Sequence, residues 1–177
     1  MKNKLVPIGI GLGVLVVVAF IGYALTRPET SAQQSRRATK SNNPDVVSDT
    51  EIHWHPELSI YVNGVKQEIP SDIGLGEQYK KNRWYDPMMR MTDVHTHDNS
   101  DQLHWEVMKD KTPVTKDHVQ LGVFFEIWGK KFNKTELLGK VDPTGRKISM
   151  TVDGQPNTEF ENHVVADKEK IEIHYQD

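Results

Sequence analysis

Hydrophobic and polar positions form distinct patterns along the chain, and the first is an uninterrupted apolar block. It runs from Leu5 to Leu25 without a charged residue. As a helix this block would be about 31 Å long, enough to cross the apolar core of a bilayer. We therefore predict a basic flank at residues 1–4 and a transmembrane signal anchor at residues 5–26. A cleavable signal peptide is the competing interpretation, which the length of the block disfavours.

The next stretch has almost nothing to bury. Ser, Thr, Gln, Asn and Pro dominate residues 27–49, which predicts a flexible linker. Residues 50–177 are enough for one compact domain. Basic residues after the apolar block outnumber the two lysines before it, and the positive-inside rule alone would favour a cytoplasmic domain. A basic start, one apolar segment and a long polar domain are typical of exported proteins, so we predict a single-pass cell-membrane protein with an extracytoplasmic C-terminal domain.

Within residues 50–177 the dominant pattern is alternation with a period of two, which is typical of strands. Asn63-Gly64 and Asp153-Gly154 each separate two such runs and predict β-hairpins. Lys170 to Tyr175 alternates strictly and predicts a final strand. Val114 to Trp128 carries an apolar stripe at helical spacing before a glycine, which predicts the main helix. The expected fold class is α+β, with hairpins packed on one helix and an element order similar to a β-grasp domain.

Two of the alternating runs contain a His-X-His pair. Residues two apart on a strand point to the same face, so His53 and His55 should emerge together, as should His95 and His97. Turn-forming residues follow the second pair, and a further strand begins near His104. We expect a hairpin in which His97 faces His104 and His95 faces Glu106, with an apolar opposite face made of Val94, Trp105 and Val107.

This arrangement predicts a transition-metal site. The chain has no cysteine, so thiolate sites and disulfides are excluded and histidine and carboxylate ligands remain. Neutral imidazole suits copper and zinc. We rank copper first because an exported domain and nearby methionines permit it, and zinc second. The alternative is a set of histidines that form only a polar face. The candidate ligands are His53, His55, His95, His97, His104 and Glu106.

Several neighbouring residues have two interpretations. Met88, Met89 and Met91 could supply thioether ligands to Cu(I), or they could fill an irregular gap in the core. Asp93, Asp98 and Glu106 could orient the ligand rings from behind or supply an oxygen ligand. Alternatively, the two aspartates could serve turn formation, and Glu106 could occupy a solvated strand position.

The combination of His53-Trp54-His55-Pro56 with His95-Thr96-His97-Asp98 resembles a family of uncharacterised, membrane-anchored, His-rich extracytoplasmic proteins of prokaryotes. Further shared segments are Asn63-Gly64, Ile69-Pro70, Leu103-His104 and Phe124 to Gly129. The resemblance covers most of residues 50–177 and implies a compact exported domain. It implies no activity and no site residues.

The favoured function is a membrane-tethered metal carrier, sensor or accessory subunit, and a non-enzymatic role is favoured over an enzymatic one without excluding the latter. One alternative is an interaction module of a membrane-protein complex that uses Trp54, Trp84 or Tyr85. A less favoured alternative is a non-haem metal enzyme with a triad of His95, His97 and Glu106, which lacks the glycine-flanked spacing of a cupin. The net charge of −3 gives no reason to expect nucleic acid as a partner.

Overall fold

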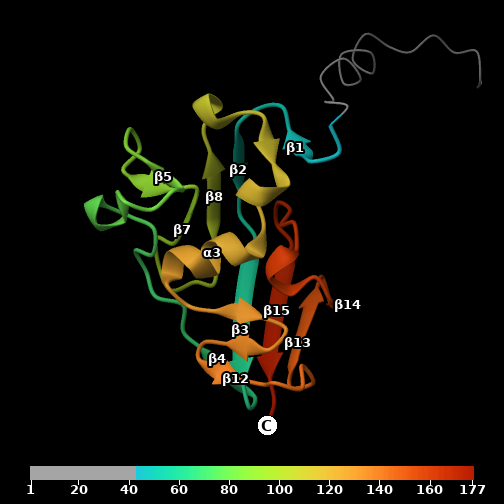
Figure 1. The fold of residues 1–177 in the computed structure, drawn as a ribbon. Helices are drawn as coiled ribbons and strands as arrows, with labels where there is room; N and C mark the ends of the chain where they lie inside the picture. Colours follow the sequence, from blue (N-terminus) through green and yellow to red (C-terminus); the bar gives the residue numbers. More distant parts are fainter. Residues whose placement is uncertain (1–42) are drawn as a thin grey trace, which may run out of the picture. The chain divides into compact units, whose positions relative to one another are not determined.

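The structure, a computed structural model, describes residues 43–177. The predicted basic flank, the predicted anchor at residues 5–26 and most of the predicted linker lie outside this range. Between residues 43 and 177, no helix is long and apolar enough to cross a bilayer. This part of the chain combines many strands with one α-helix, in agreement with the predicted α+β class (Figure 1).

The largest sheet has five strands in the order β14-β13-β15-β3-β4. The last strand of the chain, β15, is central: it pairs antiparallel with β13 and parallel with β3. Both predicted hairpins are confirmed. Asn63 and Gly64 have φ of 49° and 78°, and Asp153 and Gly154 have 49° and 76°, as a two-residue turn with two positive φ angles requires. The strands are β3 (Glu57–Val62), β4 (Val65–Gln67), β13 (Ile148–Val152), β14 (Gln155–Asn157) and β15 (Lys170–Tyr175).

A three-stranded antiparallel sheet, in the order β2-β8-β7, carries the histidines. Its strands are β2 (Ile52–Trp54), β8 (His104–Val107) and β7 (Val94–His95). The predicted register is wrong by two residues: His95 pairs with His104, and Glu106 pairs with His53 instead of His95. In the predicted register Val94 faced Val107, whereas in the structure it pairs with Trp105. A shift of two residues keeps every side chain on its predicted face, so both residues remain on the apolar side.

The predicted helix at residues 114–128 is wrong in its first half. Helix α3 covers only Leu121–Trp128, because Val114 and Thr115 form a strand, β9, and Lys116–His118 form a 3-10 turn. The expected end is confirmed, since Gly129 has φ 70° and its N–H donates to the Glu126 carbonyl. The apolar stripe is also buried as predicted, at Val119, Val123, Phe124 and Ile127.

Small elements complete the domain. Strand β1 (Val46–Ser48) pairs with β9, so the last residues of the range predicted as a linker are part of a sheet. The other strands are β5 (Tyr85–Asp86), β6 (Met91–Thr92), β9 (Val114–Thr115), β10 (Phe132–Asn133), β11 (Glu136–Leu137) and β12 (Lys140–Val141). The 3-10 turns are Glu77–Tyr79, Lys109–Lys111, Lys116–His118 and Phe160–Asn162.

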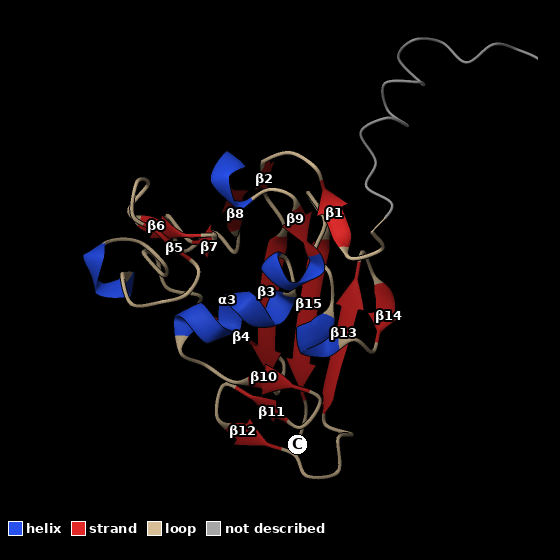
Figure 2. Ribbon diagram, turned by 45° about the horizontal axis from the view of Figure 1, so that its top comes forward, coloured by secondary structure: helices blue, strands red, loops and turns tan. Residues whose placement is uncertain are grey.

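One hydrophobic core joins these elements. Figure 2 shows α3 crossing in front of β3, with strands β2, β7 and β8 above the helix. The alternating positions Leu58, Ile60, Ile171 and Ile173 of the large sheet are fully buried. Phe124 of α3 and the apolar face of the three-stranded sheet belong to the same cluster. One side of the histidine sheet therefore packs against the core, and the histidine side chains lie on the other side.

Candidate metal centre

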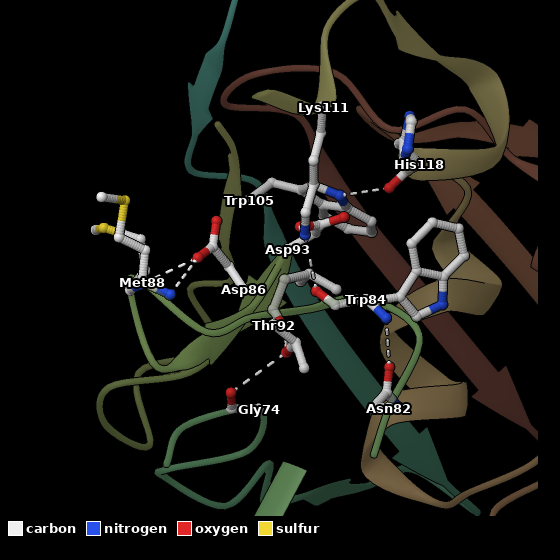
Figure 3. Close-up of polar contacts among 12 residues, drawn as sticks. Gly74, Asn82, Trp84, Asp86, Met88, Thr92, Asp93, Trp105, Lys111 and His118 are labelled. Carbon is white, nitrogen blue, oxygen red and sulfur yellow. Dashed lines mark hydrogen bonds and ion pairs between the residues drawn. The ribbon is translucent and has the colours of Figure 1, made fainter. Parts of the chain in front are cut away.

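Five histidines gather on the side of the β2-β8-β7 sheet that faces away from the core. His53, His104 and His95 each come from a different strand, and His55 and His97 lie just beyond the ends of β2 and β7. The opposite face is held by buried residues, and the indole N–H of Trp105 donates to the His118 carbonyl at 2.9 Å (Figure 3). The alternation in the sequence thus produces the polar face as predicted.

The five rings form one continuous cluster with His104 at its centre. The ring centroid of His104 lies 4.4 Å from that of His97, 4.8 Å from His55 and 5.6 Å from His95. The centroids of His53 and His55 are 4.6 Å apart. Two sets of three rings bring one nitrogen each within 4.8 Å of one another and could hold a metal ion: His95, His97 and His104, and His53, His55 and His104.

The first set contains a close pair of ring nitrogens. His95 Nε2 and His97 Nε2 are 3.2 Å apart, which is close to the separation of two ligand atoms on one ion. His95 is fully buried, whereas His97 is exposed. An ion at this position would therefore have the protein on one side and solvent on the other.

The orientation of His95 is determined by the backbone. Its Nδ1 lies 3.2 Å from the Thr92 carbonyl oxygen, which can only accept, so Nδ1 carries the proton and Nε2 keeps its lone pair. The pKa of His95 is about 4, well below 6.5, chiefly because burial disfavours the charged ring. The hydrogen bond to Thr92 opposes this shift, and the nearby rings of His97 and His104 add to it. His95 is therefore neutral at pH 7, the form that binds metals.

The second set is more open. His53 Nε2 lies 2.9 Å from Glu106 Oε1, and the His53 side chain is 60% exposed. The His55 main-chain N–H donates to Asp167 Oδ1 at 2.9 Å, which anchors the end of β2. Glu106 orients the ring of His53 in the manner of the carboxylates that stand behind metal-bound histidines.

His104 belongs to both sets, and this limits how many ions the cluster can hold. A neutral imidazole has one lone pair for a metal, because its other nitrogen carries a proton. The two sets are therefore alternatives for one ion as long as His104 stays neutral. Burial is the main cause that lowers the pKa of His104, and the neighbouring His97 and His55 lower it further.

The three carboxylates near the histidines have different roles in the structure. Glu106 contacts His53, and neither set of three ligands includes it, so the triad of His95, His97 and Glu106 is not assembled between residues 43 and 177. Asp93 points into the core and forms an ion pair with Lys111 (Figure 3). Asp98 accepts a hydrogen bond from the Ser100 N–H at 2.9 Å, which is turn chemistry.

The three methionines differ in their exposure to solvent. Met91 is buried in β6, as core filling predicts. Met88 and Met89 are 91% and 42% exposed, so core filling is wrong for them. Met89 lines a pocket together with His53, Glu106 and Met108.

Three groups that contribute to the histidine cluster or its neighbouring pocket were not predicted from the sequence. Met108 could have been found, because it follows His104 and Glu106 on the same alternating face. The Thr92 carbonyl and the Asp167 carboxylate could not, because both act through contacts that no local pattern records.

The aromatic residues of the interaction-module hypothesis are mostly covered. Trp84 is 7% exposed, and Trp54 is partly buried against the core. Tyr85 is half-buried, and its hydroxyl lies 3.4 Å from Glu77.

Comparison of the chain with protein-family models, curated proteins and solved structures finds no match.

Proposed function

We propose that this protein binds one transition-metal ion through His95, His97 and His104. The observation that carries the proposal is the convergence of three ring nitrogens within 4.8 Å, two of them 3.2 Å apart. The buried ligand, His95, is neutral and already oriented by Thr92. Little reorganisation is then needed on binding, which favours a site over a chance group of histidines.

Three imidazoles suit copper and zinc equally well, and both remain candidates for this site. The exposed side of His97 leaves a coordination position open to solvent or to another protein. Structural zinc sites are typically closed by four protein ligands, whereas an open position permits exchange. This supports a metal carrier, sensor or accessory subunit over a purely structural site.

The membrane setting is part of the proposal. The apolar block at residues 5–26 would hold the domain at the cell membrane, with residues 50–177 on the extracytoplasmic side. The domain would then present its histidines to a membrane-protein partner. We further propose a β-grasp-like fold, because two hairpins flank a last strand that runs parallel to the first, with a helix in the connection.

The test is metal analysis of the full-length chain, purified without a histidine tag, stripped with chelator and reloaded with one metal at a time. With Zn(II) we expect one ion per chain, and His95→Ala/His97→Ala together should abolish tight binding, because only the more open set of His53, His55 and His104 then remains. His97 is exposed, so His97→Ala tests the site without disturbing the core. It should weaken binding at least about tenfold, since losing even an orienting partner costs about 10–100-fold.

His174→Ala is the matched control, because it removes one histidine outside the cluster and should leave affinity unchanged. Wild-type protein that takes up no metal above the chelated background would overturn the proposal. So would a His97→Ala variant that binds as tightly as wild type.

A further inference from the structure

A second set of donor atoms lies beside the histidine cluster. A pocket of about 300 Å³ opens next to His53, and two thioethers contribute to its wall. Its lining residues are Glu51, Ile52, His53, Met89, Glu106 and Met108. The three histidines of the proposed metal site are not among these residues, so the pocket is a separate feature.

Met89 is held at this pocket by a well-defined turn. It lies between β5 and β6, where the Asp86 carboxylate accepts hydrogen bonds from the N–H groups of Met88 and Met89 at 2.7 and 3.1 Å. Arg90 closes the turn with φ 59°, and its N–H donates to the Asp86 carbonyl at 2.8 Å. Figure 3 shows Met88 on this turn, pointing away from the buried pair of Asp93 and Lys111.

The exposure of these methionines has no explanation in packing. Between residues 43 and 177, the exposed large hydrophobic residues are Val65, Met88, Met89 and Val141. Val65 and Val141 are not among the residues that line this pocket, whereas Met89 faces the same pocket as His53. Single exposed apolar side chains are common, but apolar side chains gathered at one groove indicate a binding site, and Met89 and Met108 line this pocket together.

Met108 approaches from the central strand. It follows Glu106 by two residues, so it continues the face that carries His104. Glu106 Oε1 lies 2.9 Å from His53 Nε2, which leaves Nδ1 as the nitrogen with the available lone pair. The pocket thus combines two neutral sulfur atoms, an imidazole and a carboxylate that orients it.

We propose that this pocket binds Cu(I) through the thioethers of Met89 and Met108 and the imidazole of His53. Thioether sulfur is a soft ligand that selects Cu(I), whereas zinc favours imidazole, thiolate and carboxylate. His53 also belongs to the set with His55 and His104, so an ion in the pocket would share the ligand His53 with the histidine cluster. The pocket would select copper over zinc as the metal of the proposed function, and to that extent the inference rests on that function.

The experiment uses Ag(I), a soft ion that needs no reducing agent, added to the full-length chain labelled with ¹³C at the methionine methyl groups. The methyl resonances of Met89 and Met108 should shift on addition of one equivalent, and those of Met91 and Met150 should not. Zn(II) should leave all four in place. Met89→Leu/Met108→Leu removes both sulfurs while keeping similar volume, so Ag(I) binding at the pocket should be lost without unfolding.

Met88→Leu is the matched control, since it changes the neighbouring exposed methionine, which is absent from the pocket lining. It should leave the shifts of Met89 and Met108 intact. The same titration in His95→Ala/His97→Ala separates the two proposals, because the methyl shifts should persist there even when uptake at the histidine site is lost. If Ag(I) binds the chain in a calorimetric titration but moves no methionine methyl signal, the pocket site is wrong and the histidine site stands. If Ag(I) does not bind the wild-type chain, the pocket proposal is likewise overturned.

Discussion

At the scale of single residues, His95 is the position where burial and chemistry are most closely coupled. Its ring is fully buried, yet both nitrogens have a polar neighbour: the Thr92 carbonyl at Nδ1 and His97 at Nε2. Burial keeps the pKa of this ring at about 4, so the folded protein resists protonation at a position where the unfolded chain, with an ordinary pKa near 6.5, accepts a proton. The folded state should therefore lose stability in acid.

The first prediction concerns this acid sensitivity in metal-free protein. Between pH 6.5 and pH 4 the unfolded state binds the proton and the folded state does not, so the free energy of unfolding falls as pH falls. For His95 alone the loss from pH 7 to pH 5 should be about 2 kcal/mol. Urea unfolding in chelator at the two pH values measures it.

His95→Gln provides the comparison. The variant should lose less stability than wild type over the same pH interval, because one buried titrating ring is gone. Part of the slope should remain, since burial and neighbouring rings also lower the pKa of His104. An unchanged slope in the variant would show that His95 does not titrate as its burial requires.

At the scale of elements, turns were predictable and pairing was not. Asn63-Gly64 and Asp153-Gly154 specify their hairpins through local backbone preference, which the sequence displays directly. The histidine face was predictable for a similar reason, because alternation is local. The α+β class followed from these same patterns.

The register of β7 on β8 depends instead on distant segments. The Thr96 N–H donates to the Ile73 carbonyl, so the chain leaves the ladder directly after His95. On the other strand the Leu103 N–H donates to the Pro56 carbonyl, and so β8 begins only at His104. The residues at both ends of the expected hairpin thus form hydrogen bonds with other parts of the domain. No pattern within the hairpin sequence predicts these hydrogen bonds. The first half of the expected helix fails similarly, because β9 pairs with β1.

The second prediction tests how the segment before β5 supports the site. The Gly74 carbonyl accepts a hydrogen bond from the Thr92 N–H at 2.8 Å, and Gly74 has φ 80°. A Cβ atom there would lie 2.7 Å from the Val94 carbonyl oxygen and would also clash with the Thr92 hydroxyl. Gly74→Ala should cost about 2–4 kcal/mol in urea unfolding, from backbone strain and overpacking. It should also weaken metal binding, because Thr92 orients His95.

Gly64→Ala is the matched control. Gly64 has a similar φ of 78°, but its added Cβ would meet nothing within 4 Å. It should cost only the backbone strain, about 1–2 kcal/mol, and leave metal affinity unchanged. Equal effects of the two substitutions on metal affinity would contradict the supporting role of Gly74.

At the scale of the whole domain, the histidine sheet is joined to the five-stranded sheet through the loop before β15. The His55 N–H is held by Asp167 in this loop, and the Glu57 N–H donates to the Glu169 carbonyl at 2.9 Å. The loop is itself closed by His163, whose Nε2 lies 2.8 Å from Glu169 Oε1. The His163 carbonyl also accepts from the Leu121 N–H at the start of α3. Four parts of the fold therefore meet around one buried histidine.

The last prediction is that His163 changes stability with pH in the sense opposite to His95. Burial is the largest single influence on the pKa of His163 and lowers it, but the hydrogen bonds and charges of Glu169 and Glu159 together outweigh burial and raise the pKa. The folded state then holds this proton more tightly than the unfolded state. The resulting stabilisation is complete below the unfolded pKa near 6.5 and is lost as pH rises through the folded value.

His163→Gln should therefore destabilise the metal-free protein more at pH 6 than at pH 9. Urea unfolding of wild type and variant at both values gives the difference directly, and His95→Gln in the same series should show the reverse trend toward acid. The contrary result is a loss of unfolding free energy in His163→Gln that stays constant or grows toward pH 9. It would mean that the neutral ring closes the loop through its hydrogen bonds alone. The same loop anchors His55 through Asp167. If the destabilisation is larger at pH 6, as expected, the charged form of His163 therefore stabilises both the large sheet and the edge of the histidine cluster.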